Sequence, residues 1–512
     1  MLNVRVWIGA ATAMALLGIA IVAYFALTGV DAAGPVADAD YFYLSPTRPL
    51  NGRLIPSSRL GGSDYCGHCH TEIFHQWNAS AHHFSSHNNP FYRKVALGTA
   101  ERRGAPVIKF CAGCHDPLPL LSGEIDKPEM NRWSNNAGIT CLACHRITEI
   151  HGGNGNYVVS PPVLHPLALS ENPILQTLHG TLLKATPSLH RAALSKPFYR
   201  TPEYCATCHS LTTPKAVNGV QDIVLLDEYA HWTHSRFAHN DAQAAVSKTA
   251  SCIDCHMPRI PSHDPAAKSG LIRSHRFVGG NTALPALNRD VDQLRASEDF
   301  LRDKKVLIRC ARMRRNGALL QSGCKQLSAV AGDTIDLQFD VINHGVGHTF
   351  PAGTVDSNES WVELEVRDRD RRRVFHRGFL TATGEVDSAA HFFRATFADR
   401  NGRPTDRRTS TTEAVSMVSS TVIPTEGVAS VSYRFSIPSN SRLPLLATAK
   451  INWRKFDQRF TQWVFSGKDV PHLPITVLDE ITIVIPVRAG AENSVAVHAT
   501  SDPLTQSTAK RR

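Results

Sequence analysis

Three patterns of hydrophobic and polar residues follow one another along this chain of 512 residues. Residues 6–30 form an apolar run without a charged side chain, and a helix of about 20 such residues spans a bilayer. From about residue 63 to about residue 300 the sequence is rich in histidine and short turns, with no sustained period. From about residue 304 to residue 489 apolar and polar positions alternate. These patterns predict an α+β multidomain fold that begins with an N-terminal transmembrane helix.

The alternating region predicts a C-terminal antiparallel β-sandwich of immunoglobulin-like kind over residues 301–490. In residues 335–341, Ile, Leu, Phe and Val alternate with Asp and Gln. Half-buried strands show this alternation, and Gly, Pro, Asn and Asp mark the turns between them. The other segments that we expect to be strands are residues 362–366, 431–437, 448–453, 462–465 and 481–487.

Five copies of Cys-x-x-Cys-His give the middle region its chemistry. Two thiols three residues apart lie on one face of a helical turn and bond to two haem vinyl groups, and the next residue, His, meets the iron. The copies predict five covalent haem c groups, attached through Cys66, Cys69, Cys111, Cys114, Cys141, Cys144, Cys205, Cys208, Cys252 and Cys255. The proximal iron ligands are then His70, His115, His145, His209 and His256.

Zinc knuckles are the rival explanation of the Cys-x-x-Cys pairs. Zinc sites pair one Cys-x-x-Cys with another, or with two spaced histidines, and no such pairing rule is visible in this sequence. We therefore expect residues 63–300 to form a mainly α or irregular multihaem cytochrome domain, packed around haems. Each porphyrin is a large apolar body, so such a domain needs little protein core of its own.

Only Cys310 and Cys324 lie outside the five motifs. In an oxidising compartment they could form a disulfide, which would close a loop worth about 3 kcal/mol in the chain-entropy model. Two free buried thiols are the alternative.

The ends of the chain suggest where the protein resides. Arg5 precedes the apolar run and Asp31 follows it, which places the N-terminus in the cytoplasm and the rest outside, where haem is attached. We expect residues 1–31 to be a membrane anchor, residues 32–62 a linker and residues 491–512 a disordered tail. The protein would then be held in the inner membrane and face the periplasm. If residues 1–31 are instead a cleaved signal peptide, it would be periplasmic or exported.

The formal net charge is +10 and the isoelectric point is near 9.1. Such a charge often signals a nucleic-acid or anionic-lipid partner. Here the haem propionates would offset about 5 to 10 positive charges, depending on the oxidation state of the irons. No nucleic-acid motif accompanies the basic residues, so we expect no nucleic-acid partner.

The sixth ligand of each iron decides between an electron carrier and an enzyme. The chain has 25 His and only six Met, so histidine is the expected ligand, and His/His coordination gives lower potentials than His/Met. His83 and His87 compete with His82 for this role, and the alternative for His348 is a solvated histidine in a turn. The candidate distal ligands are His82, His165, His190, His275 and His348.

The sequence resembles the multihaem cytochromes of the cytochrome c-554 and hydroxylamine oxidoreductase superfamily. The resemblance is carried by residues 66–82, by residues 138–147 with 153–157, and by residues 252–258, and it covers roughly residues 63–280. It implies haems packed in contacting pairs that relay electrons in periplasmic respiratory chains, and it supports His82 as a distal ligand. The tetrahaem carrier of this superfamily lacks a fifth haem and a sandwich. The Cys-x-x-Cys-Lys motif of pentahaem nitrite reductases is absent here.

We expect an electron carrier rather than an enzyme. The carrier would pass electrons through five bis-His haems between redox partner proteins, either a quinol-side donor or other cytochromes, while the N-terminal helix contacts the membrane. A redox enzyme that acts on a small nitrogen or sulfur species at one open-site haem is the first alternative. The second is a docking or assembly subunit of a respiratory complex, with arginines of residues 367–373 as a docking face or simply as a solvated charge run.

Overall fold

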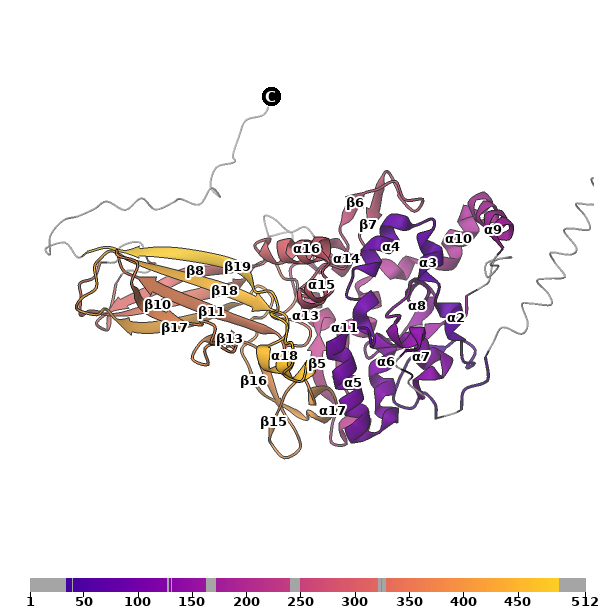
Figure 1. Cartoon of the computed structure of the whole chain (residues 1–512), viewed down its shortest axis with the longest axis horizontal. Coiled ribbons are helices and arrows are strands. Elements are labelled where there is room, and N and C mark those ends of the chain that lie inside the picture. Colours follow the sequence, from indigo (N-terminus) through magenta and orange to yellow (C-terminus); the bar gives the residue numbers. More distant parts are fainter. Residues whose placement is uncertain are drawn as a thin grey trace, which may run out of the picture.

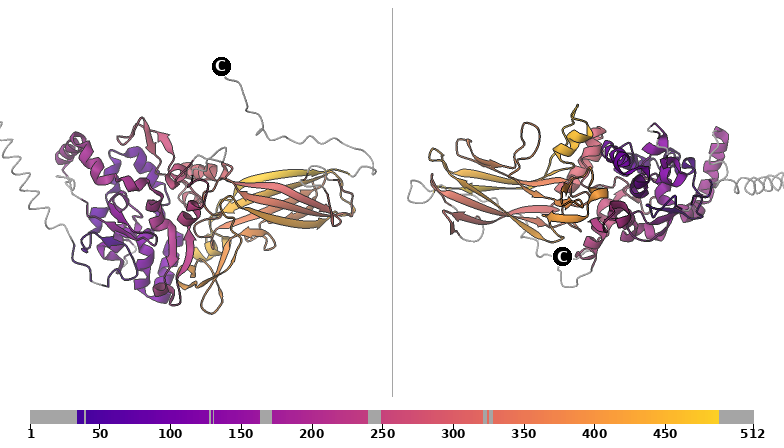
Figure 2. Two further views of the ribbon diagram at one scale, coloured as in Figure 1. Left: turned by 180° about the vertical axis from the view of Figure 1, so that it is seen from behind. Right: turned by 90° about the horizontal axis from the view of Figure 1, so that it is seen from below.

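The computed structural model describes residues 34–487, apart from residues 39, 127, 128 and 130 and the segments 163–171, 240–248, 321–323 and 325–327. Two parts lie end to end along the long axis of the molecule (Figure 1). One part is built of short helices and carries the five motifs. The other is a β-sandwich whose long strands extend away from the helices, as the view from below also shows (Figure 2).

Short helices dominate the part that carries the motifs, as the sequence without a long period predicts. The α-helices are α2 (Ser57–Leu60), α3 (Ser63–Gly67), α4 (Thr71–Asn78), α5 (Pro90–Arg103), α6 (Ile108–His115), α7 (Pro117–Ser122), α8 (Cys141–His145), α9 (Pro173–Ala185), α10 (Pro187–Leu194), α11 (Pro202–His209), α12 (Lys215–Asn218), α13 (Glu228–Thr233), α14 (Cys252–His256), α15 (Ala283–Leu287) and α16 (Val291–Arg302). Single 3₁₀ turns connect them at η1 (His83–Ser85), η2 (Ala105–Val107), η3 (Glu124–Asp126), η4 (Trp133–Asn136) and η5 (Pro197–Arg200).

The segments between these helices form three small sheets. They are formed by β1 (Arg48–Pro49), β3 (Tyr157–Val159) and β2 (Ile147–Ile150), by β4 (Ser210–Thr213) and β5 (Ile223–Asp227), and by β6 (Arg259–Pro261) and β7 (Leu271–Arg273). A modest apolar core includes residues of β2 and β3, with Leu60, Leu118 and Leu120 fully buried in it. The protein core of this part is therefore small relative to its length, as a haem-packed domain requires.

The stretch expected as a linker, residues 32–62, is packed rather than free over its described part. Phe42, Ile55 and Leu60 are buried in the same apolar core as α6 and α7. The main chain also pairs with the helical part, because Ile55 N donates to Leu121 O over 2.8 Å and β1 pairs with β3 in parallel. Residues 40–62 therefore belong structurally to the part that carries the motifs.

Two antiparallel sheets form the sandwich. One has the order β17–β10–β8–β9, with β17 (Val428–Ser436), β10 (Thr334–Asn343), β8 (Val306–Arg315) and β9 (Ala318–Leu319). The other has the order β12–β11–β18–β19, with β13 (His391–Phe393) also paired to β11, and consists of β12 (Arg373–Arg377), β11 (Glu359–Arg367), β18 (Leu445–Arg454) and β19 (Thr476–Ile485).

The core of the sandwich follows from the alternation in the sequence. Leu337 and Phe339 of β10 and Leu364 of β11 point inward and are fully buried. A one-residue slip would turn every inward side chain outward, so the register, with Phe339 opposite Val431, is fixed by this pattern. Cys310 of β8 and Cys324 form a disulfide, with their Cα atoms 5.9 Å apart.

Residues 462–465 were expected as a strand, but residues 462–464 lie in helix α18 (Gln458–Val464) and Phe465 is its C-cap. Asp457 caps this helix, since its side chain accepts a hydrogen bond from Phe460 N. Phe460 and Val464 stand one helical turn apart and are both buried. The strand prediction for this segment is wrong, because the cap and the four-residue spacing outweigh a short run of apolar residues.

A further small sheet was not expected from the sequence. It has the order β15–β14–β16, with β14 (Ala395–Ala398), β15 (Pro404–Thr405) and β16 (Ser416–Ser420). Helix α17 (Ser410–Glu413) lies between β15 and β16 in the sequence. Phe397 of β14 shares an apolar cluster with Leu225 of β5. This sheet therefore joins the sandwich to the helical part (Figure 1).

The predicted transmembrane helix needs correction. Within the described residues, no helix is long and apolar enough to cross a membrane, and the structure therefore gives no support for this element of the predicted fold. The segment from which the prediction came, residues 6–30, lies outside the described residues, as does the tail 491–512. The fold of the described chain is a mixture of short helices and several sheets.

Candidate haem sites

Each Cys-x-x-Cys-His motif lies on a short helical segment. The third and fifth motifs are identical with α8 and α14, and the second and fourth motifs end α6 and α11. In the first motif Cys66 lies in α3, and His70 is the residue before α4. A helical turn brings the two thiols of a motif to one side, which is the arrangement that two thioether bonds need.

Four of the motif histidines are oriented by a hydrogen bond at Nδ1. His115 Nδ1 lies 2.9 Å from Ser85 O, His145 Nδ1 lies 2.6 Å from Leu194 O, and His256 Nδ1 lies 2.6 Å from Val278 O. His70 Nδ1 lies 2.8 Å from a carboxylate oxygen, Asp264 Oδ1. A hydrogen bond from Nδ1–H leaves Nε2 with its lone pair, which fixes both the tautomer and the ring orientation for metal binding.

The fold brings a second histidine to four of the five motifs. The ring centres of these pairs are separated by almost the same distance: 6.2 Å for His70 and His190, 6.3 Å for His209 and His82, 6.4 Å for His145 and His275, and 6.4 Å for His256 and His348. None of these second histidines is adjacent in sequence to its motif, so the pairs are made by tertiary structure.

The loop that carries His82 is held by the segment before the third motif. Trp77 Nε1 donates to Ile139 O over 2.8 Å, and Ile139 N donates to His82 O over 2.9 Å. Gly138 has φ of +64°, and a Cβ there would lie 1.9 Å from His83 O. Only glycine fits this close approach without a shift of the backbone. The Trp-x-x-Ser-x-His and Gly-Ile-Thr segments of this chain are therefore in direct contact.

Other second histidines are held by their own Nδ1 contacts. His275 N donates to Gln76 Oε1 over 2.8 Å, and its Nδ1 lies 3.0 Å from Arg273 O. His348 comes from the sandwich, in the loop after β10, and its Nδ1 lies 2.9 Å from Thr349 O. The Asn343 side chain donates to His348 O over 2.8 Å and so fixes this loop to the end of the strand.

Burial keeps these imidazoles neutral. It lowers the pKa of His82 to about 3 and the pKa values of His256 and His275 to about 4. Neighbouring imidazoles lower these values further, in the case of His82 through His209. A neutral imidazole has the free lone pair that a metal ligand requires.

The second motif has a different environment. The ring of Tyr92 stacks on His115 with centres 4.3 Å apart, and its hydroxyl donates to Asp116 Oδ2 over 2.5 Å. His87 Nε2 lies 3.9 Å from the same carboxylate oxygen, and burial raises the pKa of Asp116 to about 7. Among the described residues, no histidine ring pairs with His115 at the separation seen for the other four motifs.

The motifs contact one another in space. The thiol of Cys66 lies beside that of Cys141, that of Cys114 beside that of Cys208, and that of Cys205 beside that of Cys252. The hydroxyl of Tyr204, in α11, donates to Cys144 O over 2.9 Å and so links the third and fourth motifs. The order in space is therefore first, third and fourth, with the second and fifth motifs both joined to the fourth.

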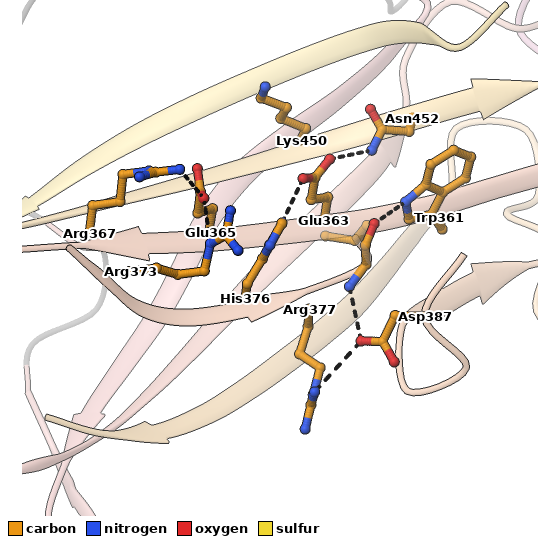
Figure 3. Close-up of polar contacts among 12 residues, drawn as sticks. Trp361, Glu363, Glu365, Arg367, Arg373, His376, Arg377, Asp387, Lys450 and Asn452 are labelled. Atoms are coloured by element: carbon orange, nitrogen blue, oxygen red, sulfur yellow. Dashed lines mark hydrogen bonds and ion pairs between the residues drawn. The ribbon is translucent and has the colours of Figure 1, made fainter. Parts of the chain in front are cut away.

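Two surface hollows are also present. One, of about 490 Å³, lies beside the fourth motif and is lined by Glu203, Ser210 and Asp227. The other, of about 630 Å³, lies on the outer face of the sandwich and is lined by Glu363, His376 and Asn452 among others. The polar side chains of this second hollow bond to one another (Figure 3), for Glu363 accepts from His376 over 2.8 Å and from Asn452 over 3.0 Å. It contains no motif residue.

The structure places the predicted ligands as follows. His82, His190, His275 and His348 each face a motif histidine, whereas His165 lies outside the described residues. The ring of the competitor His83 instead contacts that of Trp77 at a tilt, and its Nδ1 bonds to Asn78 O. Asp264 and Tyr92 were not singled out from the sequence. No local pattern marks either residue, because each meets its histidine only through the tertiary fold.

The residues present fit covalently bound haem. Two metal–nitrogen bonds of about 2 Å, with about 1 Å from each nitrogen to its ring centre, account for roughly 6 Å between two axial imidazoles. The four histidine pairs have this separation. Each pair also adjoins two cysteine thiols of one motif, the donor set that c-type haem attachment requires.

Fold and sites together define a multihaem c-type cytochrome, an electron-transfer protein with covalently bound haem. Residues 65–146 match the family described as cytochrome c554 and c-prime, which the chain resembles. The crystal structure of a penta-heme cytochrome c552 from Thermochromatium tepidum matches with a TM-score of 0.52 and 17% identity, covering 84% of this chain and 100% of that chain.

Other comparisons add little. The sporulation control protein Spo0M from Bacillus subtilis matches with 8% identity and a TM-score of 0.15 over 36% of this chain and 50% of that chain. A TM-score this low carries no argument. No curated protein matches the chain. At these identities, the cytochrome c552 structure establishes a shared fold alone.

Proposed function

We propose that this protein carries five c-type haems and relays electrons between redox partner proteins outside the cytoplasm. The observation that supports this proposal best is the set of four histidine pairs with ring centres 6.2–6.4 Å apart. Six-coordinate haems have no open position for a substrate, and each supplies a one-electron iron couple. A chain of such sites is suited to transfer electrons rather than to transform a small molecule.

In this proposal the axial pairs join residues far apart in sequence: His70 with His190, His145 with His275, His209 with His82, and His256 with His348. Nδ1 contacts hold five of these imidazoles in place, those of His70, His145, His256, His275 and His348. Burial lowers the pKa of His82, His145, His256, His275 and His348 and so favours their neutral form. Bis-His ligation, burial and hydrogen bonding would then set low potentials.

The contacts between motifs support a continuous route. The fourth motif touches the second through Cys208 and the fifth through Cys205, and Tyr204 joins it to the third. We propose the fourth motif as a branch point. Electrons would pass between the first and fifth motifs through the third and fourth, with the second motif on a side branch.

The compartment follows from the covalent chemistry. Covalent attachment of haem takes place outside the cytoplasm, and the Cys310–Cys324 disulfide is of a kind that persists in oxidising compartments. We therefore propose a periplasmic or exported protein. Cell fractionation with a cytoplasmic marker tests this, and recovery of the haem-loaded protein in the cytoplasmic fraction would contradict it.

The carrier function is tested by counting haems and measuring their spin states. A pyridine haemochrome assay on purified protein should give five haems per chain. Electron paramagnetic resonance of the oxidised protein should show low-spin signals from at least the four haems with paired histidines. A count below five, or high-spin iron at several haems, would contradict the proposal.

A second candidate function rests on the second motif. There the ring of His115 stacks on Tyr92, whose hydroxyl donates to Asp116, rather than facing a second described histidine. The positive charge of Arg407 opposes burial at Cys111, where burial raises the pKa to about 11. At His115 it acts with burial, which lowers the pKa to about 4. An open iron beside a cation would suit a small anion such as nitrite.

Ligand titration separates the two functions at the second motif. A high-spin fraction that shifts with nitrite, hydroxylamine or cyanide would favour a redox enzyme. If the iron is instead low-spin and a His165→Ala variant makes it high-spin, His165 is its ligand and the pure carrier is favoured. A low-spin iron that no histidine variant alters would also contradict the redox-enzyme function at the second motif.

A further inference from the structure

One motif histidine differs from the others in its hydrogen-bond acceptor. Three of the four Nδ1 groups described above face main-chain carbonyl oxygens, which are neutral. His70 Nδ1 instead lies 2.8 Å from Asp264 Oδ1. The first motif is therefore distinguished by a carboxylate behind its iron ligand.

Asp264 is buried and held in position. Its side chain is 1% exposed, and it lies in the loop between β6 and β7, just after the fifth motif. Oδ1 also accepts from Ala266 N over 2.8 Å, and Asp264 N donates to Ser262 Oγ over 3.0 Å. Ser262 Oγ in turn donates to Glu72 Oε2 over 2.6 Å, which ties this loop to α4. The carboxylate is thus aimed at His70 by a fixed loop.

The acceptor alters the ligand by a simple electrostatic effect. A carboxylate draws the Nδ1 proton more strongly than a neutral carbonyl, because hydrogen bonds to charged acceptors are stronger. The imidazole then becomes a more basic ligand. A more basic ligand, and a buried negative charge nearby, stabilise the ferric state more than the ferrous state, which carries less positive charge.

We propose that Asp264 lowers the reduction potential of the haem held by His70, below the value that a main-chain acceptor would give. Asp264 is thereby a positioning residue that tunes one member of the relay. This inference rests on the proposed ligation of iron by His70. It assigns a role to a residue that lies far along the chain from the motif it affects.

The test is a potentiometric titration of the complete haem-loaded protein and of an Asp264→Asn variant, followed by visible spectroscopy and electron paramagnetic resonance. Asparagine has almost the same shape and keeps a neutral oxygen acceptor. One haem should move to higher potential, with at least a tenfold change in its oxidised-to-reduced ratio at a given potential. For a one-electron couple this is 59 mV. The other haems should move far less.

Glu72→Gln is the matched control. It removes a carboxylate from the same loop contact, yet Glu72 bonds to Ser262 and not to His70. An equal shift in this control, an equal shift of all haems, or no shift in Asp264→Asn would overturn the inference.

If the Asn variant fails to take up haem, the wild-type protein decides the matter. One ferric haem should then show the near-infrared magnetic circular dichroism of an imidazolate-like ligand, and its absence would overturn the inference. Failure of the proposed function is recognised separately, because a low haem count or loss of low-spin signals would be evident in the wild-type protein before any variant is compared.

Discussion

The imidazole of His348 lies parallel to that of His256, with ring centres 6.4 Å apart and planes inclined by 9°. The two residues belong to different parts of the molecule, since His256 ends α14 and His348 follows β10 of the sandwich. The sandwich is therefore not an accessory to the motif-bearing part. It supplies one of the two histidines at the fifth motif.

Replacement of His348 tests this relationship. In His348→Ala we expect one haem to change from low-spin to high-spin, because its iron loses the proposed sixth ligand. Electron paramagnetic resonance of the oxidised protein measures the change. His344→Ala is the control, since this exposed residue lies in the same loop and should leave the spectrum unaltered. An unaltered spectrum in His348→Ala would exclude His348 as a ligand.

The contact between the two parts should be important for stability. Phe91 of α5 is 2% exposed and stacks on Phe456 of the sandwich with ring centres 3.9 Å apart. Phe91→Ala should lower the free energy of unfolding by about 3–5 kcal/mol, the usual effect of removing a buried phenylalanine. Urea denaturation followed by circular dichroism measures this. Tyr43→Ala, at a position 72% exposed, should change stability by about 0.5 kcal/mol or less.

A buried ion pair predicts a pH dependence of stability. Burial raises the pKa of Glu359 from 4.5 to about 6, despite its bond to Arg454. The folded protein therefore binds a proton more tightly at this group than the unfolded chain does. The stability that this group contributes is fully present below pH 4.5 and is lost as the pH rises through about 6, by about 2 kcal/mol in total.

Comparison with Glu359→Gln isolates this effect. The variant has no titrating carboxyl at this position, so its stability should not fall with rising pH through this group. The difference in free energy of unfolding between wild type and variant, measured from pH 4 to pH 7, should shrink as the pH rises. A difference that stays constant or grows over this range would show that the pKa of Glu359 is not raised.

The disulfide should stabilise the sandwich without affecting the haems. Replacing Cys310 and Cys324 together by serine should lower the free energy of unfolding by about 3 kcal/mol, as expected for a loop of this length. Visible haem spectra should not change, because neither cysteine lies in a motif. Cys310→Ser alone should lose as much stability. Equal stability of the double variant and the wild type would contradict this role.

Local features of the sequence were interpreted correctly where neighbouring residues alone fix the structure. The alternation in residues 335–341 became β10, and the motif Cys252–His256 became a single helical turn. Residues 462–465 were misassigned, since a strand was expected where Asp457 caps a helix. Four residues do not distinguish the helical period from the strand period, and the capping residue Asp457 lies outside residues 462–465.

The pairing of histidines could not be derived in the same way. A surplus of histidine indicated that second ligands were available, but not which motif each would face. His190 lies fifteen residues before Cys205 of the fourth motif, yet it faces His70 of the first. His82 likewise faces His209 rather than a histidine of the nearest motifs. Such contacts join residues that are distant in sequence, so no local pattern records them.

The sequence by itself determined the covalent chemistry, because two thiols and a histidine within five residues form one attachment site whatever surrounds them. It also determined the alternation from which the sandwich is built. The tertiary fold is needed to show which histidines meet, that a sandwich loop reaches the fifth motif, and that Asp264 lies behind His70. The reason is physical: these contacts depend on how separate elements pack, and packing is a property of the whole chain.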